Sequence, residues 1–322
     1  MHRIPAIVVA AASTAVIAGC LNDRATTRPT GAESRSIAFL QREVPAWSRD
    51  NGCFSCHNNG DAARALFAAK HAGFRVGTAS VRDTARWVAQ PDRWEHNKGD
   101  PGFSDQRLAN IQFAASLLAV IESGGVKDRA ALRAAARKVA GDQDADGAWQ
   151  IERQNPVGSP ATYGSTLATW MALRILRAAG TPEMSAAARK AEGWLRNVRV
   201  ENIPNAATLL LAFAQDATAL RRRQECIALI RRAQSSDGGW GPYVDAPAEA
   251  FDTALVLLAL AEVRDEEGLP GTIKRGRAFL LKQQRADGSW AATTRPSGGE
   301  SYAQQMSTTG WATLALLRTR KQ

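Results

Sequence analysis

The sequence predicts an all-α protein in which helical hairpins form a double ring, an α/α toroid. Two observations lead to this fold class. A turn of the form Asp-Gly-x-Trp occurs three times, at Asp146–Trp149, Asp237–Trp240 and Asp287–Trp290. Each copy follows a helical pattern with a charged stripe and precedes a helical pattern that is apolar all round. A striped helix lies outside and a wholly apolar one lies inside, so alternating the two builds concentric layers.

Less regular copies of the same unit fill the rest of the chain. Their outer and inner segments are Ser36–Trp47 with Asp61–Ala72, Ser80–Gln90 with Leu108–Ile121, and Ala187–Asn197 with Asn205–Ala214. Together they predict about six hairpins of about 45 residues and one domain over residues 35–322. The Asp-Gly pair makes the turn because glycine tolerates a positive φ, and the Trp is expected to wedge between adjacent hairpins.

Residues 1–19 have the form of an export signal. Arg3 precedes an apolar run, Ile4–Ala18, that is too short to span a bilayer. Its end, Ile17-Ala18-Gly19-Cys20, resembles the lipobox of bacterial lipoproteins. The resemblance implies that Cys20 is lipidated and anchors the protein to a membrane on the extracytoplasmic, periplasmic side of the cell envelope, with residues 20–34 as a flexible tether. An ordinary secretory signal and an uncleaved anchor are the alternatives.

The stretch Cys53-Phe54-Ser55-Cys56-His57 is the attachment signature of a c-type haem. Each thiol can add to a haem vinyl group, and His57 can ligate the iron. The alternatives are a Cys53–Cys56 disulfide and half of a zinc site, although zinc usually takes four protein ligands and no second Cys pair exists. Export supports haem attachment, which occurs outside the cytoplasm. Cys226, in an apolar helical pattern, is expected to be a buried, inert thiol.

The repeat geometry suggests a sixth ligand for the iron. Loops on one rim of a stack are neighbours, so the loop with Cys53–His57 should lie beside the second hairpin's loop, which carries His96. Ring closure would bring Met306 to the other side, whereas His71 falls at the far end of the first inner helix. His96 is therefore the predicted ligand, with Met306 or no protein ligand as the alternatives.

Charge gives no sign of a nucleic-acid site. The 322 residues carry 41 Lys and Arg against 31 Asp and Glu, a net charge of +10. These basic residues are spread along the chain, the densest run being Arg221–Arg223 on an expected helix, so we interpret them as a solvated outer face. Attraction to anionic lipid or to an acidic partner protein stays open.

The repeats also carry a family resemblance. Arg275-Gly276, Phe279-Leu280, Gln283-Gln284 and Gly288-Ser289-Trp290 resemble the QW repeat of squalene–hopene cyclases and their relatives, among them the prenyltransferase subunits. The resemblance covers nearly all of residues 34–322 and implies an α6/α6 toroid. It also implies that a hydrophobic, isoprenoid-like small molecule could be the ligand.

The residues weaken the enzymatic part of that resemblance. Squalene–hopene cyclases protonate their substrate through an Asp-x-Asp-Asp-Thr-Ala motif, and the aligned segment here is Glu249–Ala254, with Phe251 in place of the acid. A phenyl ring cannot donate a proton, so terpene cyclisation is disfavoured. Asp252 is expected to cap the helix that follows. The acidic loop Asp142–Gly147 alternates Asp as calcium loops do, but it lacks their terminal Glu and is interpreted as the turn of a repeat.

We therefore expect a membrane-anchored protein with covalent haem c on a helical toroid, acting in electron transfer or redox sensing with a partner protein. The first alternative is a toroid enzyme or binding protein for an isoprenoid-like ligand. The second is an interaction scaffold in which Cys53 and Cys56 form a disulfide.

Overall fold

The computed structural model describes residues 31–97, 105–127, 129–151, 157–295 and 301–320. The predicted export signal, Cys20 and most of the predicted tether lie outside them. The first helix begins at Ala32, ahead of the expected start of the toroid at residue 35. No helix among the described residues is long and apolar enough to cross a membrane.

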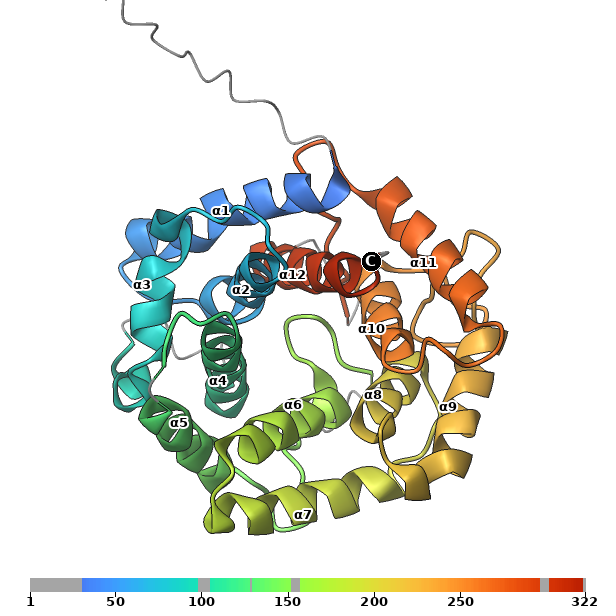
Figure 1. Ribbon diagram of the computed structural model, residues 1–322, viewed down its shortest axis with the longest axis horizontal. Helices are drawn as coiled ribbons and strands as arrows, with labels where there is room; N and C mark the ends of the chain where they lie inside the picture. Colours follow the sequence, from blue (N-terminus) through green and yellow to red (C-terminus); the bar gives the residue numbers. More distant parts are fainter. Residues whose placement is uncertain (1–30, 98–104, 128, 152–156, 296–300, 321–322) are drawn as a thin grey trace, which may run out of the picture.

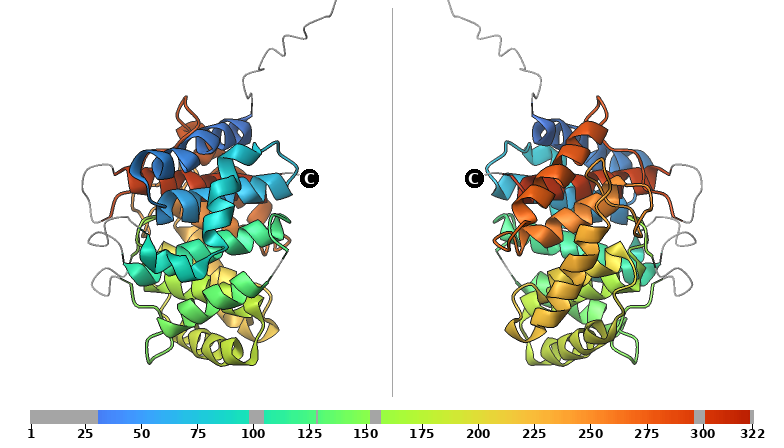
Figure 2. Two further views of the ribbon diagram at one scale, coloured as in Figure 1. Left: turned by 90° about the vertical axis from the view of Figure 1, so that its left-hand side faces the viewer. Right: turned by 90° about the vertical axis from the view of Figure 1, so that its right-hand side faces the viewer.

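Two concentric rings of helices make up the described chain, which confirms the all-α, terpenoid cyclase-like toroid (Figure 1). The outer ring comprises α1 (Ala32–Asn51), α3 (Thr78–Val88), α5 (Ala130–Gly141), α7 (Pro182–Asn197), α9 (Leu220–Arg232) and α11 (Leu269–Gln283). The inner ring comprises α2 (Ala63–His71), α4 (Gln106–Glu122), α6 (Gly164–Ala179), α8 (Ile203–Phe213), α10 (Ala250–Ala261) and α12 (Tyr302–Arg318). Side views show α3, α5 and α7 along one flank and α9 and α11 along the other (Figure 2).

The inner ring is closed. Each inner helix contacts the next, and α12 contacts α2 as well as α10. The outer ring closes through Gln284, which follows α11 and donates to the carbonyl of Ala32 at 2.9 Å, and through an ion pair between Arg277 and Glu33. Residues some 250 positions apart in the sequence therefore form the same kind of joint as consecutive hairpins.

The Asp-Gly-x-Trp turns have the predicted role. Gly147, Gly238 and Gly288 have φ of 98°, 93° and 96°, and a β-carbon on any of them would come closer than 3.0 Å to the main chain of the next outer helix. The three tryptophans are fully buried. Each indole Nε1 donates to a carbonyl of the preceding outer helix, and each backbone N–H donates to a threonine of the following inner helix. One residue thus joins both layers of its hairpin.

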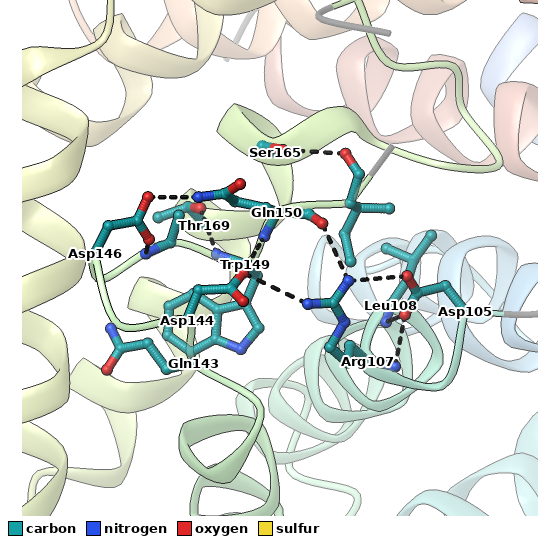
Figure 3. A network of polar contacts seen from close by, with 12 residues as sticks. Asp105, Arg107, Leu108, Gln143, Asp144, Asp146, Trp149, Gln150, Ser165 and Thr169 are labelled. Carbon is teal, nitrogen blue, oxygen red and sulfur yellow. Dashed lines mark hydrogen bonds and ion pairs between the residues drawn. The ribbon is translucent and has the colours of Figure 1, made fainter. Parts of the chain in front are cut away.

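The acidic loop around Asp144 is a turn of this kind. The Asp144 carboxylate accepts from Gln150 N at 2.8 Å and from Arg107 at 3.5 Å, and Asp146 accepts from Ala148 N at 3.1 Å (Figure 3). These oxygens are occupied by donors of the chain itself. Among the described residues, no group of three or more His, Cys, Asp and Glu could hold a metal ion.

Candidate functional site

The Cys53–His57 stretch lies where the first hairpin turns inward. Cys53 is in the connection, whereas Cys56 and His57 begin a π-helical turn, Cys56–Ala62, that leads into α2. Ser55 caps this turn by accepting from the backbone N–H groups of His57 and Asn58, at 3.1 and 3.3 Å. The haem motif was expected in a loop, but its second half is helical because the Ser55 cap starts the helix before Cys56.

Close packing holds the π-helical turn between two inner helices. A β-carbon on Gly60 would come 2.9 Å from Gln112 of α4, and one on Gly310 of α12 would come 3.0 Å from Asp61 and Ala62. Both glycines let neighbouring backbones approach more closely than a side chain would allow. The turn is thereby held within the inner ring between α4 and α12, and π-turns are frequent at functional sites.

The motif residues are enclosed. Cys53 and Cys56 are free thiols with only 8% and 9% of their surface exposed. Burial raises the pKa of Cys56 to about 12 and lowers that of the His57 imidazole to about 4. Cys226 is fully buried, as predicted, and burial raises its pKa to about 12. The Cys56 thiol is thus in its protonated form, and the two motif cysteines form no disulfide in this structure.

His57 is held in one tautomer by a buried serine. Its Nδ1 lies 3.1 Å from Ser307 Oγ, and Ser307 donates its only proton to Asp61 at 2.8 Å. With Asp61 ionised beside Arg64, Ser307 accepts from His57, which puts the imidazole proton on Nδ1 and leaves a lone pair on Nε2. Metal-ligating histidines usually have one ring nitrogen fixed in this way.

The other predicted ligands of the iron occupy three different places. His96 is exposed and lines a hollow of about 380 Å³ together with Phe54 and Asn97, whose side-chain amide pairs with the Phe54 backbone. The loops of the first two hairpins are therefore neighbours. Met306 is fully buried and adjoins Ser307, and His71 lies at the opposite end of the ring.

The residues of the motif are suited to bind a haem, but neither hollow beside the motif is lined by them. His57 offers Nε2, and the two cysteines have the required spacing. The hollow that contains His96 and a second one of about 760 Å³ both border Phe54, but neither is lined by Cys53, Cys56 or His57. The Phe54 ring stacks on Trp87 with centroids 4.6 Å apart.

Asp61 is the centre of a polar network that the sequence reasoning missed. Its carboxylate is fully buried and accepts from the Tyr163 hydroxyl, from Gln112 at 2.8 Å and from Ser307. Arg64 lies 3.3 Å from the same carboxylate. Burial raises the pKa of Asp61, while the charge of Arg64 and the three hydrogen bonds oppose this shift by stabilising the carboxylate.

Above this network lies a cavity of about 750 Å³. Its wall comes from all six described inner helices, so it is the interior of the ring, at the end where these helices terminate. The lining is mostly apolar and includes Phe67, Trp170, Leu211, Leu258, Trp311 and Leu314. The loop before α6 crosses the other end of the ring (Figure 1), where Tyr163 reaches Asp61 with the strained φ of 65°.

Arginines line the floor of the cavity. Arg64, which is 5% exposed, stacks on Trp311 with 4.4 Å between its Cζ and the ring centre. Arg174 stacks on Trp170 at 5.2 Å. Asp61 is an acid beneath this floor rather than in it, and no sequence motif marks either arginine. The only available signal was a charged residue inside an otherwise apolar inner helix.

The position equivalent to the cyclase acid is apolar, as predicted. Phe251 is 1% exposed and packs edge-on against Trp311 at 5.8 Å. The capping role predicted for Asp252 is wrong, since α10 has no side-chain cap and Asp252 instead forms a buried ion pair with Arg295 at 2.7 Å. Because Arg295 also bonds the carbonyl of Gly158, this pair attaches the loop before α6 to α10.

The fold and this apolar cavity define a terpenoid cyclase-like toroid. Among solved structures, the type II terpene cyclase MstE from Scytonema, in complex with geranylgeranyl dihydroxybenzoate, superposes with a TM-score of 0.59 at 12% identity, over 89% of this chain and 96% of that one. A protein from Actinoplanes gives 0.57 at 16% identity, over 89% and 98%. A possible member of the GH105 family from Klebsiella pneumoniae gives 0.56 at 14%, over 96% and 98%. These likenesses show the fold.

Sequence comparison matches a smaller part of the chain than the structural comparison does. The chain is 30% identical to drimenyl diphosphate synthase of Streptomyces showdoensis over 79 residues, which are 24% of this chain and 14% of that protein. It thus spans a small part of this relative's length. No family model matches the chain.

Proposed function

We propose that the protein binds a hydrophobic, isoprenoid-like ligand in its central cavity. The observation that carries this proposal is the cavity of about 750 Å³ at the centre of the ring, with an apolar wall from six helices. A volume of this size lies within the range of small-molecule sites, about 300–1,000 Å³. The complex of MstE with a geranylgeranyl compound supports this ligand class.

Binding fits the cavity better than protonation-initiated cyclisation does. Of the acids in the lining, Glu262 is paired with Arg318. Asp61, beneath the floor, is fully buried and accepts from Tyr163 and Gln112. The guanidinium groups of Arg64 and Arg174 already cover the faces of Trp311 and Trp170. A carbocation formed beside these two cations would be repelled in a low-dielectric interior.

Calorimetric titration with geranylgeraniol tests the proposal. Ala119→Phe and Ala212→Phe place a ring in the cavity from two different helices, and we expect each to weaken binding at least tenfold. Ala186→Phe, on the exposed face of α7, is the matched control. Absence of binding by the wild type, or equal binding by the filled variants, would refute the proposal.

A second function, electron transfer or redox sensing through covalent haem c, is favoured by the Nδ1-protonated tautomer of His57. In this proposal Cys53 and Cys56 hold the haem, His57 is the iron ligand, His96 is the sixth ligand, and a redox protein is the partner. Expression with the haem-attachment machinery should add the mass of one haem. The double variant Cys53→Ser/Cys56→Ser should lose it, while a wild-type apo mass contradicts the assignment.

Two further measurements address the rest of this second proposal. If His96 ligates the iron, His96→Ala should change the spin state and reduction potential, and unchanged values would exclude it. Anchoring at the periplasmic side of the membrane through Cys20 is likewise a proposal. Cys20→Ala should release the protein from the membrane fraction, and a wild type found wholly in the soluble fraction would contradict it.

A further inference from the structure

The arginines that line the cavity differ in how their guanidinium groups are occupied. The lining contains four arginines and two glutamates: Arg64, Arg174, Arg177 and Arg318 with Glu122 and Glu262. Arg177 and Arg318 lie toward the open end and are paired with Glu192 and Glu262, at 2.7 and 2.9 Å. The other two arginines of the lining are Arg64 and Arg174.

Arg64 is buried with most of its donors unused. Within the described part of the chain, its Nε and Nη2 have no hydrogen-bond acceptor, and its Nη1 reaches only the sulfur of Met171, at 3.6 Å. Its counterion among the described residues is Asp61, whose carboxylate also accepts from Tyr163 and Gln112. Buried polar groups are normally satisfied, and an unpaired guanidinium N–H is costly.

Arg174 is the second cation. Among the described residues it has no ion-pair or hydrogen-bond partner, and its side chain is accessible in the cavity. Burial is the main cause that lowers its pKa. The charge of Glu122 opposes this shift and the charge of Arg64 adds to it, so the two guanidinium groups act on each other. Two neighbouring cations in an apolar cavity form an anion site, because guanidinium matches carboxylate and phosphate oxygens.

We propose that the ligand of the central cavity is a single-chain amphiphile with an acidic head group, a carboxylate or a phosphate, bound head first by Arg64 and Arg174. This inference rests on the proposed function and specifies the ligand class of the same site. The apolar chain then lies along Leu211, Leu258 and Leu314, toward the open end. This orientation places charge at the floor, where a cyclase would need a hydrocarbon.

The test compares three ligands with one C20 isoprenoid chain: geranylgeraniol, geranylgeranoic acid and geranylgeranyl phosphate. A charged hydrogen bond is worth about 1.5–3 kcal/mol, so either acid should bind at least about tenfold more tightly than the alcohol. The tighter of the two acids identifies the head group. Arg174→Met should abolish this preference, so that the acids bind no more tightly than the alcohol does. Arg189→Met, on the exposed face of α7, should not alter the preference.

Arg64→Lys retains the charge beside Asp61, which avoids an unpaired buried carboxylate, and it should reduce the preference by removing the planar guanidinium. If the alcohol and both acids bind equally well, or if Arg174→Met keeps the preference, the acidic head group is refuted while ligand binding stands. If none of the three binds, the proposed function itself fails.

Discussion

Replacement of Gly288 by alanine tests whether the ring is closed in solution. A side chain at φ 96° is strained by about 1–2 kcal/mol, and its β-carbon would collide with the backbone of Arg35 at the start of the ring. Overpacking of this kind destabilises a core by about 1–3 kcal/mol more. We therefore expect Gly288→Ala to lower the free energy of unfolding by about 2–5 kcal/mol. Urea denaturation followed by far-UV circular dichroism measures the change.

The control for this experiment has the same backbone strain without the contact. Gly180 ends α6 with φ 67°, and a β-carbon there would meet only the Arg177 carbonyl, at 3.9 Å. Gly180→Ala should cost about 1–2 kcal/mol. Gly147→Ala, which meets Lys190 between consecutive hairpins, should cost as much as Gly288→Ala. If Gly288→Ala costs no more than Gly180→Ala, the first and last hairpins are not in contact and the closed ring is wrong.

Three further predictions concern buried charge and the missing acid. Asp61→Asn should lower the free energy of unfolding by about 3–5 kcal/mol because it leaves Arg64 unpaired, and adding Arg64→Met should recover most of this loss. The control Asp83→Asn removes one partner of an exposed ion pair and should cost less than about 1 kcal/mol. Equal losses in Asp61→Asn and Asp83→Asn would contradict the argument. Burial raises the pKa of Glu249 to about 7, which is above its unfolded value. The stability that Glu249 contributes is therefore complete below about pH 4.5 and is lost as the pH rises through 7. Glu249→Gln should flatten the dependence of the melting temperature on pH between about pH 5 and 8, and an unchanged pH profile would refute this. Neither the wild type nor Phe251→Asp should convert squalene in a product assay, since an acid needs tuning neighbours, and turnover by the wild type would overturn this expectation.

The sequence by itself determined the toroid, because its evidence is local and repeated. Asp-Gly turns and the alternation of striped and apolar helices depend on residues close together in the chain, and the structure has these turns and helices where they were predicted. The burial of Cys226, the tryptophan wedges and the neighbouring loops of the first two hairpins follow from the same periodicity. The haem, the lipid anchor and the sixth ligand depend on short motifs and stay predictions.

Only the tertiary structure decided the cavity and its charge. Asp61, Tyr163 and Ser307 are more than 100 residues apart in sequence, and ring closure brings them together. Asp252 showed no local sign of its partner Arg295, which reaches it from a loop 43 residues away. Arg64 and Arg174 each look like a polar residue on a helix, which is usually solvated. Whether such a residue faces water or an enclosed cavity depends on how six helices rotate about a common axis, and the residues that set those rotations are distributed over the whole chain.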